Sequence, residues 1–332
     1  MSAALRIGIL GTGYIPSGAV IEPAKQVPQA IVSAVGSRSL ERARSYASAH
    51  GIPRAMSYED VVSDPNIDVV YIALPPSMHA EWSILALQAG KHVLCEKPMT
   101  ANAVEAQQVA QVANRSPQVY MEAFHYLYHP FAKRVRDILD AHVIGDIHSV
   151  EAHLVVPNKF ITAENIRRKY QLGGGAMLDA GCYPLHLLRD WLGEPKQVLS
   201  ARAEVDRFDD QADVSMRAEL EFAQGRRGTL LGGFSDSESP DTEIVIQGEK
   251  GSLKITQMYL PQWGGRLLLE WDGRTYSELA DPTASYVFQL REFVRCVRDG
   301  APVLSSANEG VKIARDVDAI YKKAGLRLRG TV

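Results

Sequence analysis

The chain has 332 residues, of which 46% are hydrophobic, and its formal net charge is −3 at pH 7. This length is enough to bury two hydrophobic cores, and the nearly balanced charge gives no electrostatic footprint for nucleic acid or a membrane surface. Cys95, Cys182 and Cys296 cannot all pair and show no C-x-x-C spacing, so we expect a reducing, cytoplasmic compartment. No export signal is recognised, and no apolar run approaches the ~18 residues that span a bilayer.

The first landmark is a glycine-containing turn near the amino terminus. An apolar run over 6–10 breaks into Gly11-Thr12-Gly13-Tyr14-Ile15-Pro16, and a helix-like stretch through Lys25 then leads to a strand-like run over 30–35. In a dinucleotide-binding turn Gly11 would make the tight bend, and Gly13 would let backbone amides approach a pyrophosphate. The third glycine of the usual fingerprint is missing. Pro16 takes its place, which the first helical turn accepts because an N–H there has no intrahelical partner.

The residues after the second strand bear on the choice of cofactor. An NAD-specific site places an Asp or Glu about twenty residues after the glycines, where it binds the ribose hydroxyls. Here the sequence is Gly36-Ser37-Arg38-Ser39. A small hydroxyl residue beside an arginine suits a 2′-phosphate, because guanidinium offers phosphate a planar fork of donors. The sequence therefore predicts NADP, the alternative being that Arg38 merely begins the next helix.

Hydrophobic patterning divides the chain into two predicted domains. Residues 1–124 alternate short apolar runs with helix-like stretches, which is typical of a parallel sheet covered on both faces. Beyond Phe124 the pattern becomes strict alternation, as over 214–222, which indicates strands with one buried face, and Asp272-Gly273 is a hairpin signal. We expect an α/β protein with an N-terminal Rossmann domain over 1–124 and a C-terminal α/β domain over 125–332 that has a large, mainly antiparallel open sheet.

A glycine-led segment near the middle of the chain holds three proton-carrying side chains among apolar neighbours. If it is helical from about 175 to 192, Asp179, Tyr183 and His186 project from one face. A carboxylate and a phenol on such a buried helix must be paired or functional. The alternative is an ordinary solvated edge of a half-buried helix. Pro184 removes one backbone donor, so we expect a kink after Ala180.

Further motifs link these two landmarks and together resemble a known family. They are Leu74-Pro75-Pro76-Ser77-Met78-His79, Glu96-Lys97-Pro98, Glu122-Ala123-Phe124-His125-Tyr126 and Gly145-Asp146-Ile147. With the glycine turn and the triple-glycine helix they span nearly the whole chain, which resembles the Gfo/Idh/MocA superfamily of glucose-fructose oxidoreductases, inositol dehydrogenases and dihydrodiol dehydrogenases. Glu-Lys-Pro about eighty residues after the glycine turn and about eighty before Asp-x-x-x-Tyr is highly specific for that superfamily.

The resemblance implies catalytic roles. Lys97 would be the catalytic lysine beside the nicotinamide and Tyr183 the acid–base residue, with Asp179 orienting substrate or the lysine and His186 assisting. Free tyrosine has a pKa of about 10 and is a poor base at neutral pH, but a nearby ammonium favours the phenolate. Inositol dehydrogenases have histidine in place of Tyr183, so the tyrosine is closer to the branch of glucose-fructose oxidoreductase, D-xylose dehydrogenase and dihydrodiol dehydrogenase.

The resemblance also implies ligand contacts, one backbone feature and an assembly. The cofactor-binding set is Gly11, Gly13, Tyr14, Ile15, Ser37, Arg38, Leu74, Pro75, His79, Glu96 and Lys97. The substrate-binding set is His125, Tyr126, Arg167, Asp179 and Tyr183, although Arg167 could equally be a plain surface charge. A cis peptide is expected between Lys97 and Pro98. The C-terminal domain would bind substrate, and its uncovered apolar sheet face would form a homodimer or a dimer of dimers.

We therefore expect an NADP-dependent enzyme that transfers hydride between the nicotinamide and a CH–OH/C=O group of a sugar, cyclitol or cyclic diol, resembling D-xylose or dihydrodiol dehydrogenase. The alternatives are an NADPH-dependent keto-sugar reductase and, in another class, a non-catalytic NADP-sensing regulatory protein. Retention of the catalytic lysine, aspartate and tyrosine argues against the regulator. No metal is expected, because His125 and His129, with His153 or His186, lack the spacing of a metal site. Tyr286 is expected in the core.

Overall fold

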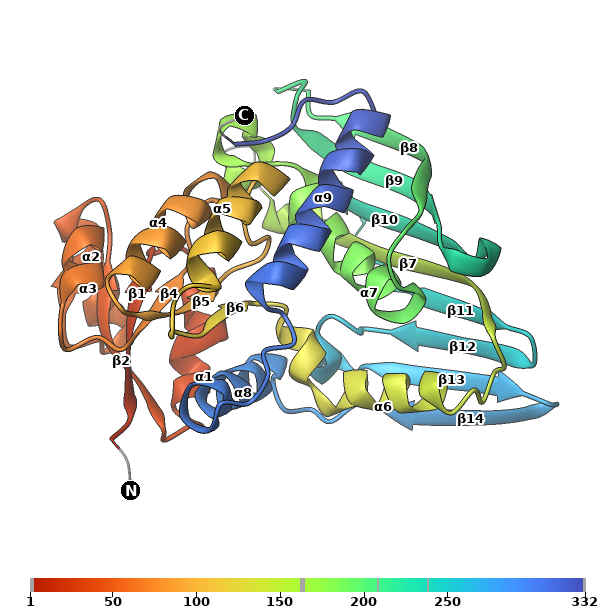
Figure 1. Ribbon diagram of the computed structural model, residues 1–332, viewed down its shortest axis with the longest axis horizontal. Helices are drawn as coiled ribbons and strands as arrows, with labels where there is room; N and C mark the ends of the chain where they lie inside the picture. The colour runs from red at the N-terminus through yellow and green to blue at the C-terminus, as the bar shows by residue number, and fades with distance from the viewer. Residues whose placement is uncertain (1–2, 162–164, 208, 238, 331–332) are drawn as a thin grey trace. The chain divides into compact units, whose positions relative to one another are not determined.

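The computed structural model describes residues 3–161, 165–207, 209–237 and 239–330 (Figure 1). The chain forms two compact units. The first extends to His125 and also includes 286–312, and the second comprises 126–285 and the residues from 313 onward. Helix α8 (Ser285–Asp299) and the start of α9 (Ala307–Lys323) therefore belong to the first unit although they follow most of the second in sequence.

The first unit is built on a parallel sheet with strand order β3-β2-β1-β4-β5-β6. The strands are β1 (Leu5–Leu10), β2 (Ala30–Gly36), β3 (Ala55–Met56), β4 (Val69–Ile72), β5 (His92–Cys95) and β6 (Tyr120–Glu122). The helices between them are α1 (Glu22–Ala24), α2 (Leu40–His50), α3 (Tyr58–Ser63), α4 (Pro76–Gln88) and α5 (Ala103–Ala113). This is the predicted Rossmann arrangement, in which apolar runs become strands buried on both faces.

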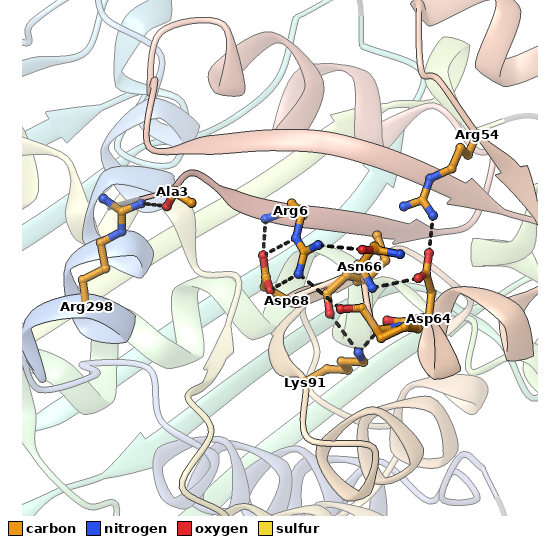
Figure 2. Close-up of polar contacts among 10 residues, drawn as sticks. Ala3, Arg6, Arg54, Asp64, Asn66, Asp68, Lys91 and Arg298 are labelled. Carbon is orange, nitrogen blue, oxygen red and sulfur yellow. Dashed lines mark hydrogen bonds and ion pairs between the residues drawn. The ribbon is translucent and has the colours of Figure 1, made fainter. Parts of the chain in front are cut away.

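A charged network occupies the amino ends of β1, β4 and β5 (Figure 2). The Arg6 guanidinium forms an ion pair with Asp68 at 2.8 Å and donates to the Asn66 side chain at 3.1 Å. The buried Lys91 ammonium donates to the carbonyl oxygen of Asp64 at 2.7 Å. These groups bond to one another at this edge of the sheet. The opposite edge, at the carboxyl ends of the strands, is where open α/β sheets bind their ligands.

The second unit contains a sheet with strand order β14-β13-β12-β11-β7-β10-β9-β8. Its strands are β7 (Ile147–Pro157), β8 (Gln197–Val205), β9 (Asp213–Glu221), β10 (Arg227–Ser235), β11 (Ile244–Gly248), β12 (Gly251–Thr256), β13 (Arg266–Trp271) and β14 (Arg274–Leu279). β7 and β10 run parallel, and the remaining neighbours are antiparallel. Asp272 and Gly273 form the predicted hairpin turn, with φ values of 47° and 72°. The prediction of a large, mainly antiparallel sheet is confirmed.

Helices cover one face of this sheet. On β9, Met216 and Leu220 are buried, and α7 (Cys182–Leu192) packs on the buried face, where Leu188 adjoins Gly228 of β10. Helix α6 (Pro130–Asp140) is joined to α7 by an ion pair between Arg136 and Asp190. In the described part of the chain, no helix is both long and apolar enough to cross a membrane.

The opposite face of the sheet is mixed rather than uniformly apolar, which differs from our expectation. Leu231 and Val245 are half-buried there. Glu151 pairs with Arg217 at 2.9 Å and with His153 at 3.0 Å. The Glu151–Arg217 pair and the half-buried aliphatic side chains give this face the composition of an ordinary half-solvated sheet, so apolar exposure alone does not call for a partner.

The segment before α7 differs from the predicted continuous α-helix. Residues Met177–Gly181 form a π-helical turn, and α7 begins at Cys182. Pro184 has no N–H to donate to the carbonyl of Ala180, which is the point where we expected a kink. A wider turn lies just upstream of this position, and π turns within helices are frequent at functional sites.

Candidate active site

The glycine turn of the first unit leaves room for a dinucleotide. Gly11 has a φ of +114°, and a Cβ there would lie 2.4 Å from the carbonyl oxygen of Ala73. Gly13 and Tyr14 are exposed, and a Cβ at Gly13 would meet nothing within 4 Å. The fold itself therefore requires Gly11, whereas Gly13 faces open space at the start of the helical stretch that begins at Ile15, where a pyrophosphate can approach backbone amides.

The segment that follows the carboxyl end of β2 carries two arginines. Ser37 is buried and Arg38 is exposed. Helix α2 begins after Ser39, whose hydroxyl accepts the N–H of Arg42 at 3.3 Å. The Arg42 guanidinium also lies 3.5 Å from the hydroxyl of Thr12 in the glycine turn. We did not predict Arg42, although it follows Arg38 by four residues. It adds a second cationic group that suits a phosphate at this edge.

His79 connects the loops that follow β4 and β5. Its Nδ1 lies 2.7 Å from the carbonyl oxygen of Pro98, its Nε2 lies 2.8 Å from that of Leu74, and the side chain is 1% exposed. Burial lowers the pKa of His79. Both ring nitrogens face backbone oxygens, so the histidine holds together the Pro75 loop and the Lys97–Pro98 loop. The predicted cis peptide between Lys97 and Pro98 is present.

Two buried carboxyl groups lie near the half-buried Lys97: Glu96 precedes it in the chain, and Glu122 contacts the backbone two residues after it. Glu96 accepts a hydrogen bond from the Tyr71 hydroxyl at 2.6 Å. Glu122, the last residue of β6, accepts the backbone N–H of Met99 at 2.7 Å. Burial raises the pKa of Glu122 to about 8, although the hydrogen bond from Met99 and the charge of Lys97 both oppose the rise. Glu122 is therefore mostly protonated at neutral pH.

Glu122 was not among the predicted site residues. The signal was available, because a charged residue that ends a buried strand must be paired or protonated. The neighbouring His125 is 2% exposed and stacks on Tyr286, with ring centroids 3.9 Å apart. Tyr286, which we expected in the core, is thereby a neighbour of a predicted substrate-binding residue.

In the second unit, the predicted acid–base residues lie in an aromatic cluster. Tyr183 is 7% exposed and His186 8% exposed. The Tyr126 hydroxyl lies 2.6 Å from Nδ1 of His186, and the ring centroids of Tyr126 and Tyr259 lie 5.9 and 5.4 Å from that of Tyr183. Burial raises the pKa of Tyr126 well above its usual value, so its hydroxyl donates to Nδ1. A neutral His186 then carries its proton on Nε2.

Asp179 and Arg167, both predicted to contact substrate, form an ion pair. Asp179 Oδ2 lies 2.8 Å from Arg167 Nε, with the side chains 17% and 35% exposed. The Arg167 carbonyl oxygen accepts the N–H of Gly175 at 2.8 Å, which ties the Arg167 loop to the start of the glycine-led segment that carries Asp179. Arg167 is therefore half-buried and paired with another predicted site residue. The pair offers both donors and acceptors, the combination that recognises sugar hydroxyls.

The histidines considered as metal ligands have separate partners. Nδ1 of His129 accepts the N–H of Phe131 at 3.0 Å, and His153 lies between Glu151 and Asp241. Among the residues that the structure describes, no group of three or more His, Cys, Asp or Glu side chains is arranged to hold a metal ion.

Two sequence families match consecutive parts of the chain. Residues 5–124 match an oxidoreductase family described as having an NAD-binding Rossmann fold, and residues 132–254 match the GFO/IDH/MocA C-terminal domain. The chain is 34% identical to D-xylose 1-dehydrogenase (NADP(+)) 2 of Haloferax volcanii, over 96% of this chain and 97% of that protein. It is 31% identical to dTDP-3,4-didehydro-2,6-dideoxy-alpha-D-glucose 3-reductase of Streptomyces violaceoruber, over 97% of this chain and 96% of the reductase.

A solved structure shares the whole architecture. The 3-ketoreductase KijD10 from Actinomadura kijaniata, crystallised with NADP and TDP-benzene, superimposes with a TM-score of 0.87 and 28% identity, covering 96% of this chain and 98% of the ketoreductase. The sequence of this chain is thus similar to enzymes named for chemistry on sugars, and its fold is similar to that of a 3-ketoreductase.

Proposed function

The chain belongs to the Gfo/Idh/MocA family of oxidoreductases, and on that premise we propose that it is an NADP(H)-dependent enzyme that interconverts a CH–OH and a C=O group of a sugar. The observation that carries this proposal is the pairing of Arg167 with Asp179, in the turn that leads directly into the helix of Tyr183, in a chain that also keeps Lys97 in its cis-proline loop. A regulator without chemistry would have no need of this set.

The cofactor proposal rests on the edge of the first sheet. Arg38 and Arg42 supply guanidinium groups where a 2′-phosphate would lie, and the open space at Gly13 fits a pyrophosphate. Two similar proteins are named for, or crystallised with, NADP. The remaining predicted cofactor contacts, from Tyr14 and Ile15 to Glu96 and Lys97, are part of the same proposal.

NADP(H), when bound, supplies or accepts the hydride. The chain's own residues handle the proton. We propose that Tyr183 removes the hydroxyl proton when an alcohol is oxidised and returns it when a ketone is reduced. The ammonium of Lys97 would stabilise the phenolate and the developing alkoxide. His186, whose Nδ1 is occupied by Tyr126, has Nε2 as its proton-bearing atom and would assist as a relay or as a hydrogen-bond donor.

The substrate proposal is a pyranose with D-xylose as the first candidate, oxidised at CH–OH. It is supported by the identity to the archaeal D-xylose dehydrogenase. The second candidate is reduction of a keto-sugar, which the two ketoreductases favour. Incubation with NADP+ and a panel of pyranoses, inositols and cyclic diols, and with NADPH and keto-sugars, distinguishes them by absorbance of the reduced nicotinamide. Absence of turnover with every member in both directions would refute the enzyme proposal.

Three substitutions test the proton chemistry. Tyr183→Phe keeps the ring and removes the hydroxyl, so kcat should fall roughly 10²- to 10⁴-fold while the Kd for NADP(H) stays nearly unchanged. Lys97→Ala should cost at least as much, and the double variant should cost less than the product of the two because the groups act as a unit. His186→Ala should cost less. Normal turnover in Tyr183→Phe with none in His186→Ala would transfer the role of base to the histidine.

We also propose, on the family resemblance rather than on apolar exposure, that the protein acts in the cytoplasm as a homodimer or a dimer of dimers that pairs the open face of the second sheet. Light scattering after gel filtration measures the mass directly. Arg217→Glu would place like charges beside Glu151 on that face, and it should shift the equilibrium toward monomer, whereas Glu59→Lys on α3 should not. A monomeric wild-type protein at micromolar concentration would contradict the dimer.

A further inference from the structure

The C-terminal residues of the second unit insert a buried arginine beside the catalytic segment. Arg329 is 0% exposed. Its Nη2 donates to Asp213 Oδ1 at 2.8 Å, its Nε donates to the carbonyl oxygen of Gly174 at 3.2 Å, and its Cζ lies 3.9 Å from the ring centroid of Tyr321. Burying a guanidinium costs free energy unless its N–H donors are hydrogen-bonded. The contacts that satisfy Arg329 have defined directions, so they fix the position of the groups that they join.

Asp213 connects Arg329 to the catalytic segment. Its Oδ1 accepts hydrogen bonds from Arg329 and from the Tyr321 hydroxyl, the latter at 3.0 Å, while its Oδ2 accepts the backbone N–H of Met177 at 2.6 Å. Burial raises the pKa of Asp213, and the charge of Arg329 opposes the rise. Met177 is the first residue of the π turn that carries Asp179. The guanidinium therefore acts on the start of that turn through a single carboxylate.

The glycines that precede the turn fit closely around this pair. Gly175 has a φ of +139°, and a Cβ there would lie 2.2 Å from Asp213 Oδ1 and 2.8 Å from the Tyr321 hydroxyl. Only glycine allows the backbone to approach the carboxylate so closely. Of the glycine-led segment that we took from the sequence as a sign of an active site, Gly175 is therefore required by the close approach of Asp213, whereas Gly174 is confined by the backbone of Ile166 and Lys169.

The same C-terminal residues hold the loop that carries Arg167. The Tyr170 hydroxyl donates to the carbonyl oxygen of Leu328 at 2.6 Å. The Arg329 guanidinium also lies over the Tyr170 ring, with Cζ 5.2 Å from its centroid. Arg167 and Asp179, which form the ion pair at 2.8 Å, thus lie on two segments that are both fastened to the residues around Arg329.

We propose that Arg329 is a positioning residue for the reaction, which holds the Arg167–Asp179 pair, and through the same segment Tyr183, in the geometry that turnover requires. It acts through Asp213 and the Gly174 carbonyl and has no direct part in the chemistry. Its catalytic consequence rests on the proposed function. The contacts themselves are a property of the fold, so they can be tested separately.

The first experiment compares Arg329→Ala with a matched control. Arg189→Ala also removes a largely buried arginine from an ion pair in the second unit, that of Arg189 with Asp316, whose side chains are 10% and 17% exposed. Both variants should melt earlier than wild type. At a temperature well below both midpoints, Arg329→Ala should lose kcat by roughly 10- to 100-fold with the KM for NADP(H) unchanged, because small misplacements of reacting groups cost that much. Arg189→Ala should stay within about twofold of wild type.

A second experiment uses chemical rescue and a conservative variant. Guanidinium chloride at a concentration too low to denature should restore part of the kcat of Arg329→Ala, whereas sodium chloride at equal ionic strength should not. Arg329→Lys keeps the charge and loses the planar fork, so it should fall between wild type and Arg329→Ala. If Arg329→Ala does not fold, Tyr170→Phe is the alternative, because it removes only the hydrogen bond to the Leu328 carbonyl oxygen. It should lower kcat by less than the roughly 10- to 100-fold expected for Arg329→Ala, without affecting folding.

A third experiment measures the contacts without any substrate. Amide hydrogen exchange of peptides covering 165–180 should accelerate in Arg329→Ala, and peptides of β1 and β4 should not change. Unchanged exchange at 165–180, or a full kcat in a variant that only melts earlier, would overturn the proposal. If the wild-type protein itself turned over no sugar, the proposed function would be wrong, and the exchange experiment alone would decide whether Arg329 holds the catalytic segment.

Discussion

Replacing Glu122 by glutamine should change how the stability of the protein depends on pH. The side chain is 1% exposed and accepts the backbone N–H of Met99 at 2.7 Å. Glutamine has nearly the same shape, and its carbonyl oxygen can accept the same hydrogen bond. The substitution therefore removes the ionisable group and keeps the contact between β6 and the segment that follows Lys97.

The magnitude follows from the pKa of Glu122, which burial raises from 4.5 to about 8. Between these values the folded protein keeps a proton that the unfolded chain releases. The free energy of unfolding must therefore fall as pH rises, by about 1.4 kcal/mol for each pH unit between the two pKa values, and level off near pH 8. From pH 6 to pH 8 the wild-type protein should lose about 2 kcal/mol through this one group, and Glu122→Gln should not.

Urea unfolding of both proteins at several pH values gives the difference directly, since contributions from all other groups cancel between them. The advantage of Glu122→Gln over wild type should grow from pH 6 to pH 8. Glu105→Gln is the matched control, because Glu105 is also buried and accepts a backbone N–H, from Ala101 at 3.2 Å. Parallel curves for wild type and Glu122→Gln over this range would show that the carboxyl group is ionised in the folded state and would refute the reasoning.

Four other substitutions have defined outcomes. Arg38→Ala should lower the affinity for NADP(H) at least tenfold, about 1.4 kcal/mol, and the affinity for NAD(H) much less. Arg42→Ala should have the same effect to a smaller extent, because the Arg42 guanidinium is partly engaged with Thr12. Titration with both nucleotides measures these affinities, and equal losses for NADP(H) and NAD(H) would argue against a 2′-phosphate site. Tyr126→Phe removes the hydrogen bond to His186 and should lower stability by about 1 kcal/mol, with a loss in kcat no greater than that of His186→Ala; a larger kcat loss would make Tyr126 itself a catalytic residue. Tyr259→Phe removes a buried hydroxyl that finds no hydrogen-bond partner among the described residues, so the thermal midpoint should stay the same or rise; a clear fall would reveal a partner of that hydroxyl.

Elements and their order could be predicted because their signals are local. The apolar runs of the Rossmann sheet and the alternation over 214–222 became strands, and the Asp272-Gly273 pair became a hairpin. The π turn over Met177–Gly181 could not be predicted in form. The absence of the Pro184 N–H indicates that one helical hydrogen bond is missing after Ala180, but it does not specify the π turn that lies upstream of it.

Residues of the candidate site were predictable where a short motif carries them, and not where their partner is distant in the chain. Nothing in the sequence around Arg167 indicates its ion pair with Asp179. His79 lies in a recognisable motif, yet nothing in the sequence indicates that both of its ring nitrogens face backbone oxygens. Hydrogen bonds between loops depend on tertiary structure, and sequence periodicity does not report them.

Most of the segments that carry the proposed catalytic residues are held by buried polar contacts. Glu122 binds the N–H of Met99 beside Lys97, and Asp213 binds the N–H of Met177 before Asp179. Apolar packing tolerates small shifts of a backbone, whereas a hydrogen bond to a peptide N–H fixes both its distance and its direction. Each such contact requires a polar group to be buried, which costs free energy. Such contacts are expected where a reacting group must be held within a fraction of an ångström. Buried carboxyl groups that accept a backbone N–H next to a predicted catalytic residue are therefore where loss of activity should exceed loss of stability.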